Sequence, residues 1–341
     1  MQIHFVARAL ASQWPDIDTL DEDDIARHAR RFRGGINNWI VQTFIRVRKP
    51  LLAADMTPTI GERLVGDCVN VAHRDSLNRL LAPYHRSYIV GVRADRPPLH
   101  SCKWELVQND LERGGPQARH MPFWPQPGLV PRDAERGTRV ERIAYFGRTA
   151  AAPAWFYDQR FHSKLRRLGV EFEIRDGEWF DYRDVDLVLA HRIESPTVLR
   201  HKPASKLVNA WLAGTPALLA NEPAYAALKR SALDYIGIES PYDVIKAVER
   251  LRGSPQHYLA MVSNGRQRGE MFAAAATKER WLRLLLDEVI PAAIEWRDDK
   301  KRYGHGWINQ LARMSRQKIA SKYFKLRVYH EWQRQSYLRV G

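Results

Sequence analysis

The fold is decided by the stretch Lys202-Pro203-Ala204-Ser205-Lys206-Leu207-Val208-Asn209-Ala210-Trp211-Leu212-Ala213-Gly214-Thr215-Pro216-Ala217-Leu218-Leu219-Ala220. It predicts a helix over 203–213, a Gly-x-Pro turn and a buried strand over 217–220. The free N–H groups and the dipole at a helix start attract anions, and Lys202 and Lys206 fall at that end. In an open α/β sheet this is where a phosphate group binds. The alternative is a surface helix with two solvated lysines.

Strands and helices alternate on both sides of this stretch. Strand-like runs occupy 143–147, 170–174, 185–190, 217–220 and 235–238, and helical patterns occupy 153–168, 203–213, 222–229, 241–252 and 255–296. The alternation predicts a doubly wound parallel sheet.

The first third of the chain has the same character with weaker patterns. Strand-like runs cover 2–7, 68–72, 88–92 and 104–108, and helical patterns follow Gly34-Gly35 to about 48 and cover 76–81. Four prolines and a glycine between 120 and 131 interrupt any regular element. We therefore expect an N-terminal domain at 1–125, a linker at 126–142, a second domain at 143–296 and a tail at 297–341.

Composition limits the class of protein. The 341 residues include 54 Lys+Arg and 39 Asp+Glu, a formal charge of +15, and 45% are hydrophobic. The tail from 299 holds eleven basic and two acidic residues, so its partner should be anionic. Two cysteines cannot build a disulfide framework or a four-cysteine zinc site. No window approaches 18 uninterrupted apolar residues, and a signal-peptide pattern is lacking, so we expect a cytoplasmic protein.

Three segments together resemble one enzyme family. They are the helix and turn at 206–216, the helix at 243–251 and the stretch at 254–266. In this order they are similar to the nucleotide-sugar-binding domain of bacterial retaining glycosyltransferases with the GT-B fold. The resemblance covers about 143–290. It implies an α/β fold in which two Rossmann-like domains face a cleft. Two positions depart from the family, which usually has acids where this chain has His201 and Asn209.

The resemblance also implies site residues. Arg148, which follows Gly147 at the end of a strand, would reach the donor diphosphate, and Lys206 would be its counterpart. In the family a Gly-Gly loop like that of Gly35 approaches the donor phosphates or the acceptor, and Asn209 stands where the family has an acid that binds the ribose. Position alone adds Lys202 and Ser205 at the predicted helix start, and Gly147, Glu194 and Glu222 after the carboxyl ends of strands, as candidates to hold the phosphates or the hydroxyls of the donor. A base that activates an acceptor could be Asp55, His73, Arg74 or Asp95. The Asp184-x-Asp186 pair spells a metal motif but is interpreted as the start of a strand.

The function that follows is glycosyl transfer. The family implies a donor that is a nucleotide-diphosphate sugar, a saccharide or lipid-linked acceptor, and a role in the synthesis of surface polysaccharide or glycolipid. No metal and no further cofactor are expected. The alternatives are a sugar-nucleotide epimerase or phosphorylase on the same fold, or a basic nucleic-acid-binding protein.

The tail carries a second hypothesis. Aromatic and aliphatic residues interleave with its cations, which suits the headgroup region of an anionic membrane. A peripheral position on the inner face of the membrane would follow. The alternatives are a helix packed back on the first domain and, less favoured, a nucleic-acid partner.

Overall fold

The computed structural model describes residues 1–77, 86–113, 117–299 and 306–340. The chain divides into two compact units. Unit 1 comprises Met1–Phe123, Ser195–Pro203 and Thr277–Gly341, and unit 2 comprises Trp124–Glu194 and Ala204–Ala276. This division differs from the expected domains, since 195–203 and 277–296 lie in unit 1 and the expected linker lies in unit 2.

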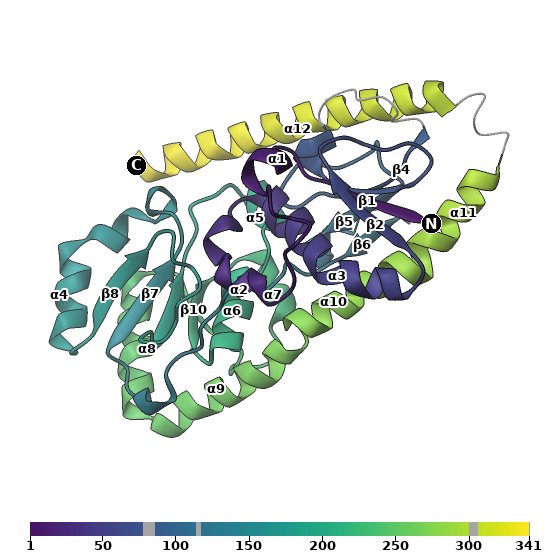
Figure 1. Cartoon of the computed structure of the whole chain (residues 1–341). Helices are drawn as coiled ribbons and strands as arrows, with labels where there is room; N and C mark the ends of the chain where they lie inside the picture. Colours follow the sequence, from purple (N-terminus) through teal and green to yellow (C-terminus); the bar gives the residue numbers. More distant parts are fainter. Residues whose placement is uncertain (78–85, 114–116, 300–305, 341) are drawn as a thin grey trace. The chain divides into compact units, whose positions relative to one another are not determined.

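The sheet of unit 1 is wholly parallel. Its strands are β1 (Gln2–Val6), β2 (Thr57–Gly61), β3 (Val69–His73), β4 (Tyr88–Val92), β5 (Trp104–Val107) and β6 (Ala118–His120), in the order β2-β1-β3-β4-β5-β6 (Figure 1). The central strands β3 and β4 are buried throughout, as strands covered on both faces must be. The four expected strands are confirmed, and the two edge strands β2 and β6 are additional.

The helices of unit 1 come from distant parts of the chain. A π-helical turn (Asn37–Val41) leads into α3 (Gln42–Ala53), so the helix expected to end near 48 continues through Pro50. The others are α1 (Leu10–Gln13), α2 (Asp24–Arg27), α5 (Pro196–His201), the π-helix at Leu284–Val289, α11 (Ile290–Asp298) and α12 (Gly306–Val340). A 3₁₀ turn covers Arg74–Leu77, and the rest of the helix expected at 76–81 lies outside the described residues.

Unit 2 repeats the architecture. Its strands are β7 (Arg142–Phe146), β8 (Glu171–Arg175), β9 (Leu187–Ala190), β10 (Ala217–Ala220) and β11 (Ile236–Ile238), in the order β11-β10-β9-β7-β8. If each sheet is numbered from its own first strand, unit 2 has the doubly wound order 2-1-3-4-5, and unit 1 has the same order with a sixth strand added after the fifth. All five expected strands are confirmed, each with bounds that differ by at most two residues.

Helices cover both faces of the second sheet. They are α4 (Gln159–Arg167), α6 (Ser205–Ala213), α7 (Pro223–Leu228), α8 (Pro241–Gly253) and α9 (Pro255–Glu270), with α10 (Ala274–Arg283) following. Along β7, Ile143 and Tyr145 join one buried cluster while Ala144 and Phe146 join another. This alternation is what a strand between two helical layers requires. Gly214, at φ +69°, ends α6 in the left-handed conformation, as the Gly-x-Pro turn predicts.

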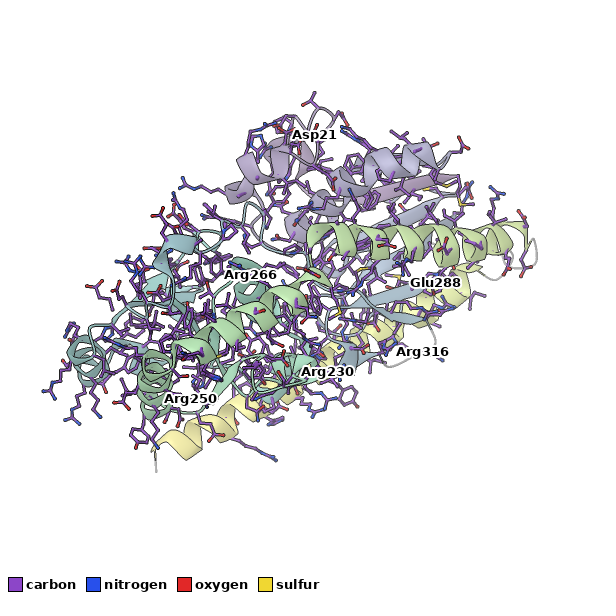
Figure 2. The ribbon with its side chains drawn as sticks, turned by 90° about the horizontal axis from the view of Figure 1, so that it is seen from below. Asp21, Arg230, Arg250, Arg266, Glu288 and Arg316 are labelled. Atoms are coloured by element: carbon purple, nitrogen blue, oxygen red, sulfur yellow. The ribbon has the colours of Figure 1, made fainter. Side chains whose placement is uncertain are left out.

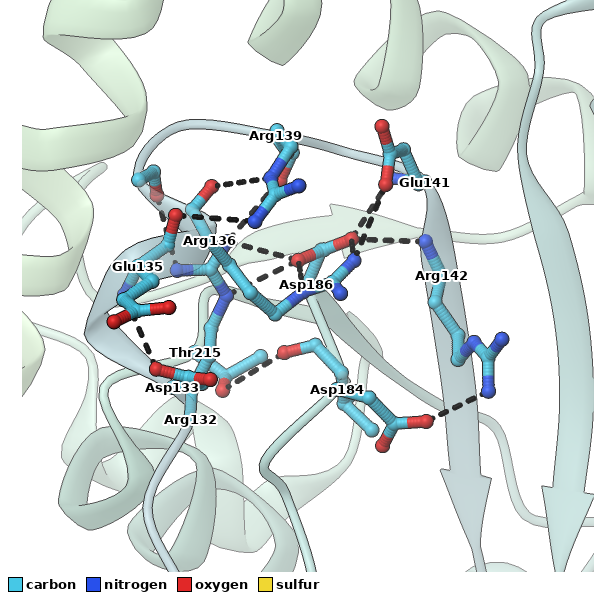
Figure 3. Close-up of polar contacts among 12 residues, drawn as sticks. Arg132, Asp133, Glu135, Arg136, Arg139, Glu141, Arg142, Asp184, Asp186 and Thr215 are labelled. Carbon is cyan, nitrogen blue, oxygen red and sulfur yellow. Dashed lines mark hydrogen bonds and ion pairs between the residues drawn. The ribbon is translucent and has the colours of Figure 1, made fainter.

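A buried ion cluster secures the segment that precedes β7 (Figure 3). One oxygen of Asp186 accepts hydrogen bonds from Arg132 and Arg136, each at 2.8 Å, and the other accepts from the backbone N–H groups of Glu141 and Arg142. Asp186 directly precedes β9, while Asp184 bonds to Arg142. Both carboxylates of the Asp-x-Asp pair therefore bind arginines of their own unit.

Candidate functional site

Each sheet has one point where its strand order reverses, between the first and third strands of the unit. Ligands of open α/β sheets bind beyond the carboxyl ends of the strands at such a point. In unit 2 the point lies between β7 and β9. Gly147-Arg148 follows β7, and His191-Arg192 follows β9. The sheet therefore brings two arginines to the place where a ligand is expected.

The ring of Tyr145 connects two of the predicted residues. A Cβ atom at position 147 would lie 2.5 Å from Tyr145 Cζ, so only glycine fits there while the ring stays in place. The Nζ atom of Lys206, in the first turn of α6, lies 5.1 Å from the centroid of the same ring. The aromatic face attracts this cation and helps to hold it beside the end of β7. Gly147 and Lys206 are thus brought together.

Glu222 lies at the carboxyl edge of the same sheet, between β10 and α7. It makes an ion pair with Arg192; the Glu222 side chain is buried, and that of Arg192 is 10% exposed. Burial acts to lower the pKa of Arg192, but Tyr225, Glu222 and Tyr145 outweigh it and hold that pKa above its ordinary value. Within the described part of the chain, Glu222 Oε1 and the Tyr225 hydroxyl are buried without a hydrogen-bond partner. Such atoms at a ligand edge are candidates to bind polar groups of a ligand.

The other predicted residues of this edge are accessible to different degrees. Arg148 is exposed, and its side chain forms no hydrogen bond or ion pair with any residue that the structure describes, although its backbone carbonyl accepts a hydrogen bond from Ala151. Ser205 is the first residue of α6, whose N-cap Ala204 offers no side-chain cap. The N–H groups at this helix start are therefore placed to bind an anion. Glu194 is half-buried and is the last residue of the first segment of unit 2.

Asn209 occupies a structural position inside α6. It is buried, and its Oδ1 accepts a hydrogen bond of 3.1 Å from the backbone N–H of Gln126. It also bonds to the hydroxyl of Tyr182, whose pKa is raised by burial. Asn209 thereby attaches the segment before β7 to α6. An amide in this position uses its carbonyl oxygen within the protein.

Unit 1 has a reversal point of its own, between β1 and β3, and Gly35 belongs to it. A Cβ atom at Gly35 would lie 2.5 Å from Nε2 of His73, the last residue of β3. The Nδ1 atom of His73 accepts the backbone N–H of Asp75 at 3.2 Å, which assigns the ring proton to Nε2. Among the described residues, Nε2 has no hydrogen-bond partner. The His73 ring therefore places an N–H donor without a described partner next to Gly35.

The environment of His73 keeps it neutral. Burial lowers the pKa of His73 to about 4, and Arg96 and Arg74 act in the same direction, while Asp75 and Asp95 oppose them. A neutral imidazole with its proton on Nε2 can donate a hydrogen bond to a substrate oxygen. His73 was one of four residues considered as a base, and this tautomer makes it a donor at Nε2 instead.

Lys202 and its neighbour His201 belong to unit 1, whereas Ser205 and Lys206 belong to unit 2. Lys202 forms an ion pair of 2.8 Å with Asp95. His201 is buried, lies 3.1 Å from Glu112 and stacks on Phe324 with ring centroids 5.2 Å apart. The two lysines that were predicted to share one helix end therefore have different surroundings, because Lys202 is the C-cap residue of α5 whereas Lys206 lies in the first turn of α6.

Of the other three candidates for a base, Asp95 pairs with Lys202 and Arg74 donates a hydrogen bond of 2.7 Å to Ser321. Asp55 lies between α3 and β2 with φ +57°, at the amino end of that strand.

The sequence assigned no role to Arg192 or Tyr145. Arg192 follows a strand as Arg148 does, so the same positional signal was available for it. The position of the Tyr145 ring has no signature in the sequence.

Comparison with known proteins identifies the fold. No family model matches the chain, and no curated protein matches it significantly in sequence. Among solved structures it is similar to AviGT4, a glycosyltransferase involved in avilamycin A biosynthesis, with a TM-score of 0.53, 14% identity and coverage of 85% of this chain and 98% of that one. It is similar to HepE from Anabaena, solved in complex with UDP, with a TM-score of 0.50, 11% identity and coverage of 84% and 100%.

A third structure, TarM, gives a TM-score of 0.47 at 10% identity, covering 64% of this chain; the chain spans about half (54%) of its length. At these identities the comparisons speak to the fold. The similarity to AviGT4 and HepE, together with the two parallel sheets, establishes the expected α/β fold with two Rossmann-like domains, the GT-B fold.

Proposed function

We propose that the protein is a glycosyltransferase that moves a sugar from a nucleotide-diphosphate sugar to a saccharide or lipid-linked acceptor in the synthesis of surface polysaccharide or glycolipid. The observation that carries this proposal is the carboxyl edge of the sheet in unit 2. There Lys206 and the start of α6 lie beside Gly147, and Arg148 follows directly. This combination suits a diphosphate, which needs cations and free N–H groups together.

The chemistry follows from the charge on the leaving group. When the bond from the sugar to the diphosphate breaks, the electron pair leaves with the diphosphate and its negative charge grows. Lys206 and the N–H groups of α6 would stabilise that charge more strongly in the transition state than in the bound donor. Arg148 would add a two-pronged contact to the phosphates. In this proposal two cations take the place of a metal ion, and no other cofactor takes part.

Glu222 of unit 2 would orient the donor. One of its carboxylate oxygens pairs with Arg192 and the other has no described partner, so it can accept a hydrogen bond from a hydroxyl of the ribose or sugar. In unit 1, the neutral His73 would donate its Nε2 proton in a hydrogen bond to an oxygen of a substrate beside Gly35. The resemblance of 206–216 to retaining enzymes favours retention of the anomeric configuration.

The test combines binding and turnover. Thermal shifts with nucleoside diphosphates and sugar nucleotides identify the donor, since a ligand at 100 times its dissociation constant stabilises by about 2.7 kcal/mol. Lys206→Ala should abolish the shift and lower sugar transfer by about 100-fold, as loss of one charge-stabilising donor does. The matched control is Lys246→Ala, since Lys246 also lies over a tyrosine ring, that of Tyr242 at 4.4 Å, but on α8.

The outcomes separate the proposal from its rivals. Transfer that continues in excess EDTA supports the metal-free mechanism. If the protein isomerises or phosphorolyses the sugar nucleotide without an acceptor, it is an epimerase or a phosphorylase and not a glycosyltransferase. An equal effect of Lys206→Ala and Lys246→Ala, or tight salt-dependent binding of nucleic acid with no nucleotide shift, contradicts the proposal.

A further inference from the structure

Helix α12 has two different long faces. One face packs on unit 1 at regular helical spacing. There Gln317 accepts hydrogen bonds from the backbone and hydroxyl of Ser101, Phe324 stacks on His201, and Glu331 accepts from the backbone and hydroxyl of Thr197 at 2.9 and 2.7 Å. These contacts run along much of the helix, which is coloured yellow in Figure 1. They fix which side of α12 faces away from unit 1.

The opposite face is apolar and exposed. Ile308 and Leu326 each lie two and a half turns from Gln317, on the far side of the helix, and are 48% and 44% exposed. The same side carries further large apolar or aromatic residues, 46–70% exposed: Leu311, Ile319, Tyr323 and Tyr329. Among the described residues of unit 1, the contacts given above are made by the other side of the helix and do not explain these exposed residues. A long apolar stripe left on a surface marks an interaction site.

Cations border this stripe on both sides. By their spacing along the helix, Lys318 and Lys325 line one border, with Lys322 just inside it, and Arg316, Arg327 and Arg334 line the other. Arg316 is labelled in Figure 2. The helix as a whole carries eight basic residues and one acidic residue. An exposed apolar face between two rows of cations matches the arrangement by which helices lie in the headgroup region of an anionic bilayer.

We propose that α12 binds the surface of an anionic lipid bilayer through this face, lying in the plane of the membrane. Within the described residues, no helix is long and apolar enough to cross a membrane, so the interaction is at the surface. The apolar side chains enter the boundary between headgroups and acyl chains, and the flanking lysines and arginines contact the lipid phosphates. A second copy of this highly cationic helix is a poor occupant of the same face because like charges repel.

The experiment uses the full chain, because removal of α12 would uncover the surface of unit 1 that it covers. Sedimentation is measured with vesicles of neutral phosphatidylcholine and with vesicles that also contain phosphatidylglycerol. We expect binding to the anionic vesicles only. Ile319→Glu and Leu326→Glu should each lower the partition coefficient by about tenfold or more, since each moves a charge into the apolar boundary. The control is Leu259→Glu on α9, where Leu259 is 53% exposed.

Four results would overturn the proposal. Equal binding to neutral and anionic vesicles would show that the cations do not contribute to binding. No binding to either kind of vesicle would show that α12 does not bind a bilayer. Binding that survives Ile319→Glu and Leu326→Glu shows that the apolar face takes no part. A concentration-dependent dimer in sedimentation velocity, or a complex with RNA, that the same substitutions abolish would give this face another partner. Nucleotide-induced thermal shifts, measured in parallel, show whether each variant is folded and keep this test separate from the proposed transfer activity.

Discussion

Asp186 is fully buried, and both oxygens of its carboxylate accept hydrogen bonds from arginines or backbone N–H groups. Replacing it with asparagine leaves Arg132 buried without its counter-charge. We expect Asp186→Asn to lower the free energy of unfolding by about 3–5 kcal/mol. Urea unfolding followed by circular dichroism measures this loss. Asp184→Asn, two residues away and 40% exposed, should cost no more than about 1 kcal/mol, and equal losses would contradict the argument.

His73 should make stability depend on pH in a defined window. Its pKa is lowered by burial to about 4 in the folded state, against 6.5 for the ordinary side chain. As the pH falls from 6.5 to about 4, His73 becomes protonated in the unfolded chain but stays neutral in the folded chain. The free energy of unfolding therefore decreases over that range. We expect His73→Gln to reduce the pH slope of the free energy of unfolding there by up to one proton. An unchanged slope would show that His73 has the same pKa in the folded and the unfolded chain, which contradicts the argument.

At the level of single residues, the sequence predicted which residues lie at the ends of strands and helices more reliably than it predicted their hydrogen-bond and ion-pair partners. Gly147, Lys206 and Glu222 were selected because they stand where strands or helices end, and that information is local. The partner of Glu222 is Arg192, thirty residues away, and the carbonyl of Asn209 binds a backbone N–H from position 126. Such pairings depend on how elements come together in three dimensions, which spacing along one chain does not encode.

Among the elements, the pair α6 and α9 packs through glycines. A Cβ atom at Gly265 would lie 2.9 Å from Cδ1 of Trp211, and one at Gly269 would lie 3.2 Å from a methyl carbon of Leu212. We expect Gly265→Ala to destabilise the protein by about 1–3 kcal/mol, because the tryptophan must move. Thermal unfolding measures the change. Gly253→Ala is the control, since a Cβ atom there has open space, and it should be neutral or slightly stabilising.

The predictability of elements followed their burial. The central strands β4 and β10 are continuous apolar runs, and β3 is a buried strand with Asn70 and His73 as its only polar residues; all three were predicted with nearly the observed bounds. The edge strands β2 and β6 were not predicted. β2 contains Pro58 and β6 has only three residues, so neither shows a clear strand pattern in the sequence. Helix α5 was missed for a related reason: it is six residues long and directly precedes the stretch that was used to define α6.

For the whole molecule, the proposed donor site predicts where a nucleotide should act. The phosphate-binding groups belong to unit 2, at the ends of β7 and β9 and the start of α6. We expect UDP, or the diphosphate that the thermal screen selects, to slow hydrogen exchange most at 145–149, 191–194 and 204–208. Exchange mass spectrometry measures this. Protection confined to peptides of 86–107, on the sheet of unit 1, would place the nucleotide elsewhere.

The way in which the units share the chain has a consequence for its synthesis. Unit 1 begins the sequence but takes in Ser195–Pro203 and everything from Thr277 onward, whereas unit 2 ends at Ala276. A nascent chain leaving the ribosome therefore holds every segment of unit 2 while unit 1 still lacks its last helices. Unit 2 can therefore complete its fold before unit 1, although the synthesis of unit 1 begins first. Until α12 has been synthesised, the surface of unit 1 that this helix covers stays exposed, and we expect chaperones to bind there.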